Sequence, residues 1–125
     1  MEYTHGMSLI LNTRKVDGHI IVEVSGRVDS GSSCLQLREL TNRIAEDGGR
    51  YLVLDMAGIT YMDSTGLGLL LSIYATIRNQ GGDLKLLNVS PRVQELLKIT
   101  RLIHVFEIFD DENHAIAKKG ATPSA

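Results

Sequence analysis

Two hydroxyl groups and a carboxyl group follow one another at the predicted start of a helix. Asp63, Ser64, Thr65 and Gly66 precede an apolar pattern with helical spacing. The N-terminus of a helix carries unpaired N–H groups and a partial positive charge, so it favours a phosphate group. We expect Gly66 and Gly68 to leave the first turn open to the active site of another protein. The segment therefore predicts an exposed Ser64 whose hydroxyl is reachable and tolerates modification. Phosphorylation there would add about −1.5 to −2 units of charge.

The same residues also fit an ordinary helix cap. Asp, Ser and Thr are common N-cap residues, and capping alone requires no regulation. The regulatory interpretation adds a role for charge, because Asp29 and Asp63 are both expected near Ser64. Repulsion between these carboxylates and a phosphate would change how the surface meets a partner, without a change in the fold.

Catalytic interpretations of these residues are disfavoured. A nucleophile elbow needs Gly-x-Ser-x-Gly, and Met62 stands at its first position, while the histidines are scattered along the chain. A dinucleotide-binding fingerprint that starts at Gly66 would need its third glycine where Leu71 stands. Asp55 suggests a response-regulator receiver, but the acidic pair that would hold magnesium is missing after the first strands. The chain is predicted not to be an enzyme, to hold no metal and to need no cofactor.

Composition narrows the class of protein. The chain has 125 residues, of which 43% are apolar, and a formal net charge of −2. This balance argues against a general affinity for nucleic acids or anionic membranes, which would call for a basic excess. Cys34 is the only cysteine, so no disulfide forms within the chain, as a reducing compartment allows. With no apolar signal segment and no apolar run long enough to span a bilayer, we expect a cytoplasmic protein without direct membrane contact.

Hydrophobic periodicity and turn residues predict nine elements. Asp17-Gly18 favours a hairpin turn between the first two strands, and polar loops are expected at 26–33 and 57–63. In chain order the predicted elements are a strand from Met7, a strand over 19–25, a helix from Cys34 to Gly48-Gly49, a strand over 51–56, a helix that follows Asp63 and stops at Gly81-Gly82, a strand over 84–89, a helix opened by Ser90-Pro91, a strand over 105–109 and a helix over 110–119.

This order predicts an α/β fold with a mixed sheet of about five strands and about four helices. The hairpin makes the first pair of strands antiparallel, and helical crossovers make the other pairs mostly parallel. We expect a single domain over residues 7–119, a flexible N-terminus over 1–6 and a disordered tail over 120–125.

Several segments resemble the STAS-domain anti-sigma factor antagonists. The resemblance covers about residues 7–118, and its most specific parts are Leu54-Asp55-Met56 and the segment from Tyr61 to Gly68. Gly26-Arg27-Val28-Asp29 is similar to the family's Gly-Glu-Leu-Asp loop. Leu84–Pro91 and Leu97–Thr100 are similar to a later strand and helix of the family.

The resemblance implies a partner switch. In the family, the first hydroxyl of the Asp-Ser-Ser/Thr-Gly motif is phosphorylated, which corresponds to Ser64 here. The unphosphorylated antagonist binds an anti-sigma factor with serine kinase activity and so releases a sigma factor for transcription. Phosphorylation ends this binding, and a PP2C-type phosphatase resets the switch. The residues expected to contact the partner are Asp29, Asp63, Thr65, Gly66, Leu67 and Gly68.

Two positions depart from the family pattern. Arg27 replaces the usual acidic residue of the first loop, and Arg101 stands where a glycine is common. An alternative function keeps the fold and changes the role, namely a structural STAS subunit of a stress-signalling scaffold or of a membrane transporter. The intact Asp63-Ser64-Thr65-Gly66 motif favours the switch.

Overall fold

A computed structural model describes residues 9–29 and 32–117, and these form five strands and four helices. The elements are β1 (Leu9–Val16), β2 (His19–Val28), α1 (Ser32–Glu46), β3 (Tyr51–Met62), α2 (Ser64–Asn79), β4 (Asp83–Leu87), α3 (Pro91–Ile99), β5 (Glu107–Phe109) and α4 (Glu112–Ala117). The termini predicted to be flexible, 1–6 and 120–125, lie outside the described residues, as does Met7.

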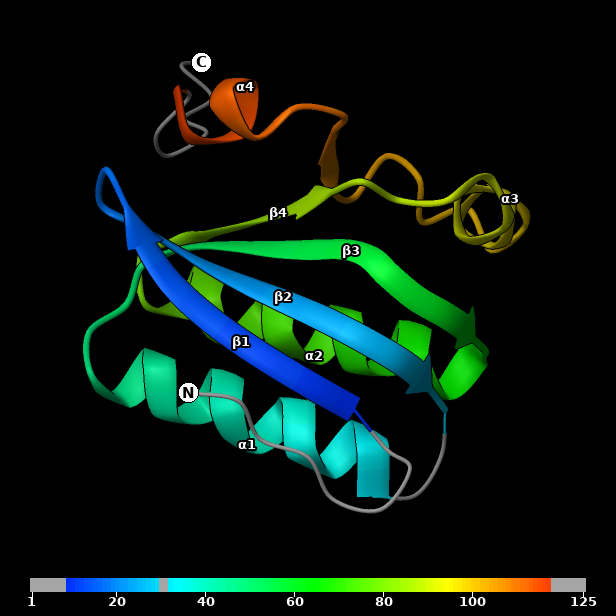
Figure 1. Ribbon diagram of the computed structural model, residues 1–125, viewed down its shortest axis with the longest axis horizontal. Coiled ribbons are helices and arrows are strands. Elements are labelled where there is room, and N and C mark those ends of the chain that lie inside the picture. The colour runs from blue at the N-terminus through cyan, green and yellow to red at the C-terminus, as the bar shows by residue number, and fades with distance from the viewer. Residues whose placement is uncertain (1–8, 30–31, 118–125) are drawn as a thin grey trace.

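The strands form one mixed sheet in the order β1-β2-β3-β4-β5 (Figure 1). β1 and β2 pair antiparallel, and each later pair of neighbours is parallel. The predicted α/β fold with an antiparallel first pair is therefore confirmed. Since parallel strands end at the same edge of a sheet, the carboxyl ends of β2 and β3 lie next to each other.

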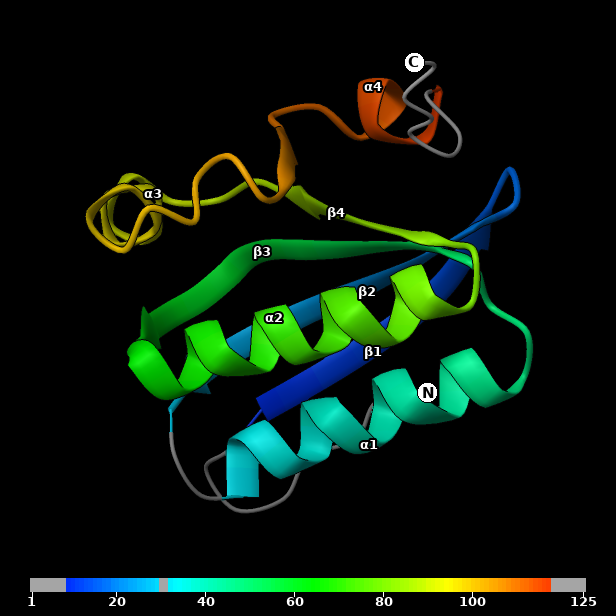
Figure 2. The same cartoon turned by 180° about the vertical axis from the view of Figure 1, so that it is seen from behind.

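Helices α1 and α2 cover one face of the sheet, while α4 lies on the other side of β4 (Figures 1 and 2). α3 lies beyond β4, and its buried residues Val93 and Leu97 belong to the same core cluster as those of α2. The main core lies beneath α1 and α2, where alternate strand residues such as Val22, Leu54 and Leu86 are buried. A smaller cluster on the opposite face joins Ile21 and Val53 to α4. Burial on both faces explains why the central strands form nearly continuous apolar runs.

The turn and cap residues recognised in the sequence form the expected structures. Asp17 and Gly18 have φ angles of 50° and 81°, as a tight hairpin turn requires. The Ser90 hydroxyl accepts a hydrogen bond from the Val93 N–H at 3.2 Å, and Pro91 is the first residue of α3. Gly48, with a φ of 90°, lies just after α1. These local signals fix where elements begin and end.

The prediction of loops at 26–33 and 57–63 was partly wrong, because strands extend into both segments. β2 continues to Val28 and β3 to Met62, and the two remain paired along this extension. Register shifts after Glu23 and after Gly26 keep the strands together despite the polar residues. The strand pairs thus carry the chain directly to the first residues of the candidate site.

Other boundaries moved by a few residues. β1 extends to Val16, while β5 is limited to Glu107–Phe109 and α4 to Glu112–Ala117. Arg101 has a φ of 63°. The STAS-domain antagonists that the sequence resembles commonly have glycine at this position. Arg101 therefore takes the left-handed conformation that glycine adopts at little cost.

Candidate functional site

Ser64 is the first residue of α2, and it is exposed. The helix follows β3 after a single intervening residue, Asp63, so Ser64 lies at the carboxyl edge of the sheet. The structure confirms that the helix begins at Ser64 and that this residue is accessible. A kinase could therefore reach this position without unfolding the chain.

Asp63 caps the helix. Its backbone is extended, and its carboxylate Oδ1 accepts hydrogen bonds from the N–H groups of Thr65 at 3.0 Å and Gly66 at 3.2 Å. Its carbonyl oxygen accepts from the Leu67 N–H at 3.1 Å. The sequence-based expectation that a phosphate would meet unpaired N–H groups here was wrong for Thr65 and Gly66, because Asp63 already binds both.

The residues that follow Ser64 differ in exposure. Thr65 and Gly68 are exposed, whereas Gly66 is buried and Leu67 is only 4% exposed, within the core. A Cβ atom on Gly66 would lie 2.7 Å from both the Met62 Cγ and the Val28 carbonyl oxygen, while one on Gly68 would meet nothing within 4 Å. Gly68 leaves the surface open as predicted. Gly66 and Leu67 were expected to contact the partner, but both are buried. They instead pack the first turn of α2 against the ends of β2 and β3.

Asp29 lies at the same edge, directly after β2. Its carboxylate accepts a hydrogen bond from the Arg27 Nε at 3.2 Å, and its carbonyl oxygen accepts one from the Cys34 thiol at 2.8 Å. Burial raises the pKa of Cys34, and the carboxylates of Asp63 and Asp29 raise it further. Both carboxylates therefore lie near enough to the Cys34 thiol to raise its pKa. The expected proximity of Asp29 and Asp63 is supported.

Arg27 and Tyr61 form a contact that the sequence analysis missed. The Arg27 guanidinium lies 4.2 Å from the centroid of the Tyr61 ring, and the two residues are neighbours across β2 and β3. Extending both strands by a few residues would have predicted it. Met62, the neighbour of Tyr61, is 8% exposed and packs into the core.

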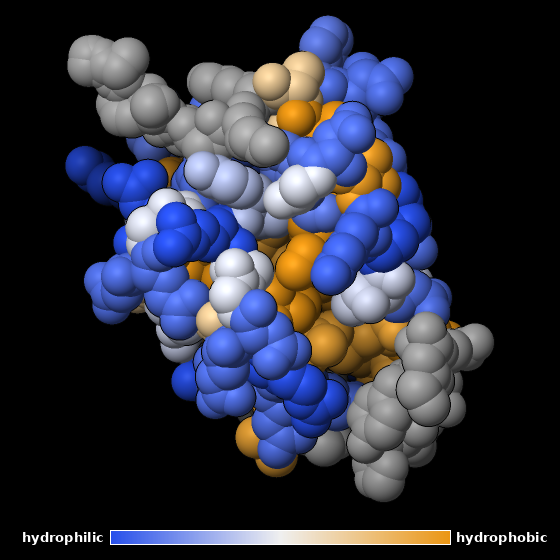
Figure 3. Space-filling view, turned by 90° about the vertical axis from the view of Figure 1, so that its left-hand side faces the viewer, coloured by the Kyte–Doolittle hydropathy of each residue, from blue (hydrophilic) through white to orange (hydrophobic). Residues whose placement is uncertain are grey.

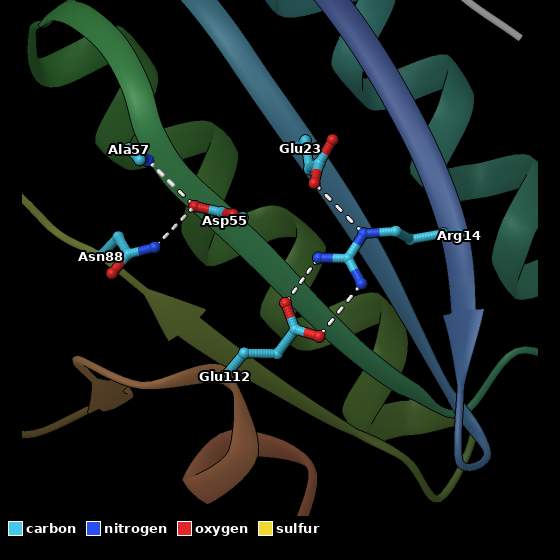
Figure 4. Close-up of polar contacts among 6 residues, drawn as sticks. All are labelled: Arg14, Glu23, Asp55, Ala57, Asn88 and Glu112. Carbon is cyan, nitrogen blue, oxygen red and sulfur yellow. Dashed lines mark hydrogen bonds and ion pairs between the residues drawn. The ribbon is translucent and has the colours of Figure 1, made fainter.

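Asp55 lies within β3, away from the helix start. Its Oδ1 accepts hydrogen bonds from the Ala57 N–H and from Asn88 Nδ2, both at 3.1 Å (Figure 4). On the same face of the sheet, Arg14 of β1 pairs with Glu23 and Glu112 (Figure 4). Asp55 thus ties β3 to Asn88, the residue after β4, and also binds Ala57, the first residue of the segment that leads to Ser64.

The described residues offer no group of three or more His, Cys, Asp or Glu side chains that could hold a metal ion. Of the histidines in the described ranges, His19 is buried at the start of β2, and His114 pairs with Asp111. Over residues 9–29 and 32–117, no helix combines the length and the apolar character that crossing a membrane requires. Ser64 is thus an exposed residue at the start of a helix whose N-cap is Asp63.

Comparisons with known proteins give the family. The sequence model of the STAS domain matches residues 11–115. The anti-sigma F factor antagonist of Paenibacillus polymyxa is 30% identical over 90% of this chain and 96% of its own length. The anti-sigma-B factor antagonist of Bacillus subtilis is 34% identical, over 82% of this chain and 92% of its own.

A solved structure of an anti-sigma factor antagonist from Mycobacterium paratuberculosis superimposes with a TM-score of 0.79. It covers 94% of this chain and 98% of that one, at 20% identity, and so supports the fold. The sequence matches and the fold agree. The chain belongs to the STAS domain family and resembles its anti-sigma factor antagonists, which are non-enzymatic regulators.

Proposed function

We propose that this chain is a cytoplasmic anti-sigma factor antagonist that works as a phosphorylation-controlled partner switch. In the unphosphorylated state it binds an anti-sigma factor with serine kinase activity, and a sigma factor is released. The kinase then transfers a phosphoryl group to Ser64 and the complex separates, until a PP2C-type phosphatase removes the group. The observation that carries the proposal is the exposed position of Ser64 at the first residue of α2.

The contact surface is proposed to centre on four residues at the carboxyl edge of β2 and β3. Thr65 and Gly68 are exposed on α2, and Asp29 and Asp63 supply the charge. Gly68 contributes by the absence of a side chain, which leaves space for the kinase to approach. Gly66 and Leu67 act indirectly, since their burial holds the first turn in place.

The switch is proposed to act through charge. Asp29 and Asp63 carry two negative charges, and Arg27 balances one of them through its contact with Asp29. Phosphorylation adds about −1.5 to −2 units, so the net charge of these groups changes from about −1 to between about −2.5 and −3. A partner surface that accommodates the first state would be repelled by the second, because like charges that face each other across an interface cost several kcal/mol.

Phosphoryl transfer is the direct test. The purified chain is incubated with its cognate anti-sigma factor and ATP, and intact-mass spectrometry is expected to show one added phosphoryl group. Ser64→Ala should abolish this gain, and Thr60→Ala is the matched control because Thr60 is also exposed and lies outside the proposed contact surface. Phosphorylation of Ser64→Ala at the wild-type rate would refute the assignment.

Binding to the kinase separates recognition from modification. Ser64→Ala removes a hydroxyl without adding charge, so it should bind the kinase with nearly wild-type affinity. Ser64→Asp adds one negative charge at the same position and should weaken binding about tenfold or more. Equal affinity of the Ala and Asp variants in calorimetric titration would show that charge at this position does not control the complex.

A further inference from the structure

A second surface feature lies at the other end of the sheet. A hollow of about 840 Å³ opens between the β1–β2 hairpin and the C-terminal half of α1. Tyr51, the first residue of β3, lines it, whereas Ser64 lies two residues beyond Met62, the last residue of that strand. Twelve strand residues at about 3.3 Å each separate the two places by roughly 35–40 Å. The hollow is therefore distinct from the candidate phosphorylation site.

The floor of the hollow is apolar. Ile20, Leu40 and Ile44 line it together with the Tyr51 ring. Figure 3 shows this floor as an orange patch recessed between blue, hydrophilic ridges. The backbone at Gly49 lies directly against it, because a Cβ there would lie 2.6 Å from Ile44 Cγ2 and 2.9 Å from Ile20 Cδ1. Glycine at this position thus keeps the recess from being filled by a side chain.

The rim of the hollow is basic. Among the described residues, four cations line it, Arg14, Lys15, Arg43 and Arg50, against a single carboxylate, that of Asp47. Arg14 is held by Glu23 and Glu112. The other three cations form no ion pair with any residue in the described ranges. A chain with a net charge of −2 therefore places four cations around one apolar recess, three of them outside the ion pairs formed among the described residues.

We propose that this hollow binds a small amphiphilic anion, with an aliphatic or aromatic body on the floor and a carboxylate, phosphate or sulfonate group at the rim. Its volume falls within the range of small-molecule sites, about 300–1,000 Å³, and such sites combine an apolar lining with a few polar groups. Arg43 and Arg50 supply the charge that complements the anionic group. Because the floor is recessed, a free ligand fits it better than a flat bilayer does (Figure 3).

Fluorescence titration tests the proposal on the unphosphorylated full chain. The anionic probe 8-anilinonaphthalene-1-sulfonate should bind and be displaced by dodecanoate. Its affinity should fall as salt is added, since ions screen exposed charges. The double variant Arg43→Gln/Arg50→Gln should weaken binding about five- to tenfold. It should leave the binding of the neutral probe N-phenyl-1-naphthylamine unchanged.

A matched control places the same two charge losses elsewhere. Arg92→Gln/Lys98→Gln removes two exposed cations of α3, which do not line the hollow, and should bind the anionic probe like wild type. Amide chemical shifts provide the location, with the largest changes expected at Gly48, Gly49 and Tyr51. If the first double variant fails to fold, the salt titration and the shifts of the wild-type chain decide the question.

Four results would overturn the proposal. The first is equal loss of affinity in both double variants. The second is a set of shift changes centred away from the hollow, for example around the exposed Ile99. The third is binding of the chain to phosphatidylglycerol vesicles together with no displacement of the probe by dodecanoate. The fourth is probe binding that appears only when residues 1–8 are deleted, which would identify this segment as the occupant. None of these results depends on whether Ser64 is phosphorylated.

Discussion

Two glycines in the first turns of α2 should respond in opposite directions to the same substitution. Gly66 and Gly68 lie two residues apart, and alanine is the better helix former by about 1 kcal/mol. A Cβ on Gly68 meets no atom within 4 Å, so Gly68→Ala should gain about 0.5–1 kcal/mol of unfolding free energy. At Gly66 the Cβ would lie 2.7 Å from both the Met62 side chain and the Val28 carbonyl oxygen.

The overlap at Gly66 is hard to relieve. Val28 and Met62 are paired at the ends of β2 and β3, and both side chains are buried. Inserting a methyl group into such a site costs about 1–3 kcal/mol, and contact with backbone favours the upper half of that range. After the gain in helix propensity, Gly66→Ala should lose about 1–2 kcal/mol. The difference between the two variants should therefore be about 1.5–3 kcal/mol.

Urea unfolding followed by circular dichroism measures both values, with thermal unfolding as a second assay. At about 4 °C per kcal/mol for a chain of this size, Gly66→Ala should melt roughly 4–8 °C below wild type and Gly68→Ala roughly 2–4 °C above. An increase in stability for Gly66→Ala would refute the close packing of the first turn against β2. A decrease for Gly68→Ala would refute the open space proposed for the kinase.

The other predictions concern two carboxylates. Asp63→Ala should lower the unfolding free energy by about 1–2 kcal/mol, because the N–H groups of Thr65 and Gly66 lose their acceptor, whereas Asp63→Asn should lose only a few tenths; urea unfolding of the pair checks this. Burial, followed by the charge of Glu107, raises the pKa of Asp83, so the folded state binds a proton more tightly than the unfolded state. Wild-type stability should then fall as pH rises through the ordinary Asp pKa of about 4 towards the raised value, and Asp83→Asn should be more stable than wild type at pH 7 but not at pH 3. Unfolding curves for both proteins at the two pH values test this, and an equal difference at both would contradict it.

Local sequence signals predicted most of the fold. The Asp17-Gly18 turn and the Ser90-Pro91 helix start depend on neighbouring residues alone, and both were predicted correctly. The second halves of β2 and β3 depend instead on each other. Gly26, Arg27, Ala57 and Gly58 have weak strand propensity, and they remain extended because the strands pair across two register shifts. A single sequence carries no direct signal for such pairing.

The candidate site shows the same division. The sequence predicted the position of Ser64 and its exposure, because an N-cap motif is local. The burial of Gly66 and Leu67 was missed, since it depends on how α2 packs against the ends of β2 and β3. The Arg27–Tyr61 contact was missed for a related reason, as it joins two strands whose extension was not predicted.

The capping geometry bears on how phosphorylation would act. A phosphate at a helix N-terminus can reorganise the structure if it captures free N–H groups, but Asp63 already binds those of Thr65 and Gly66. To bind these N–H groups, a phosphoryl group on Ser64 would have to displace the Asp63 carboxylate, which already accepts hydrogen bonds from both. The alternative is to remain at the surface next to Asp63, where both groups stay hydrated. This second arrangement needs no change in the chain, so we expect the added charge to act on the partner surface rather than on the fold.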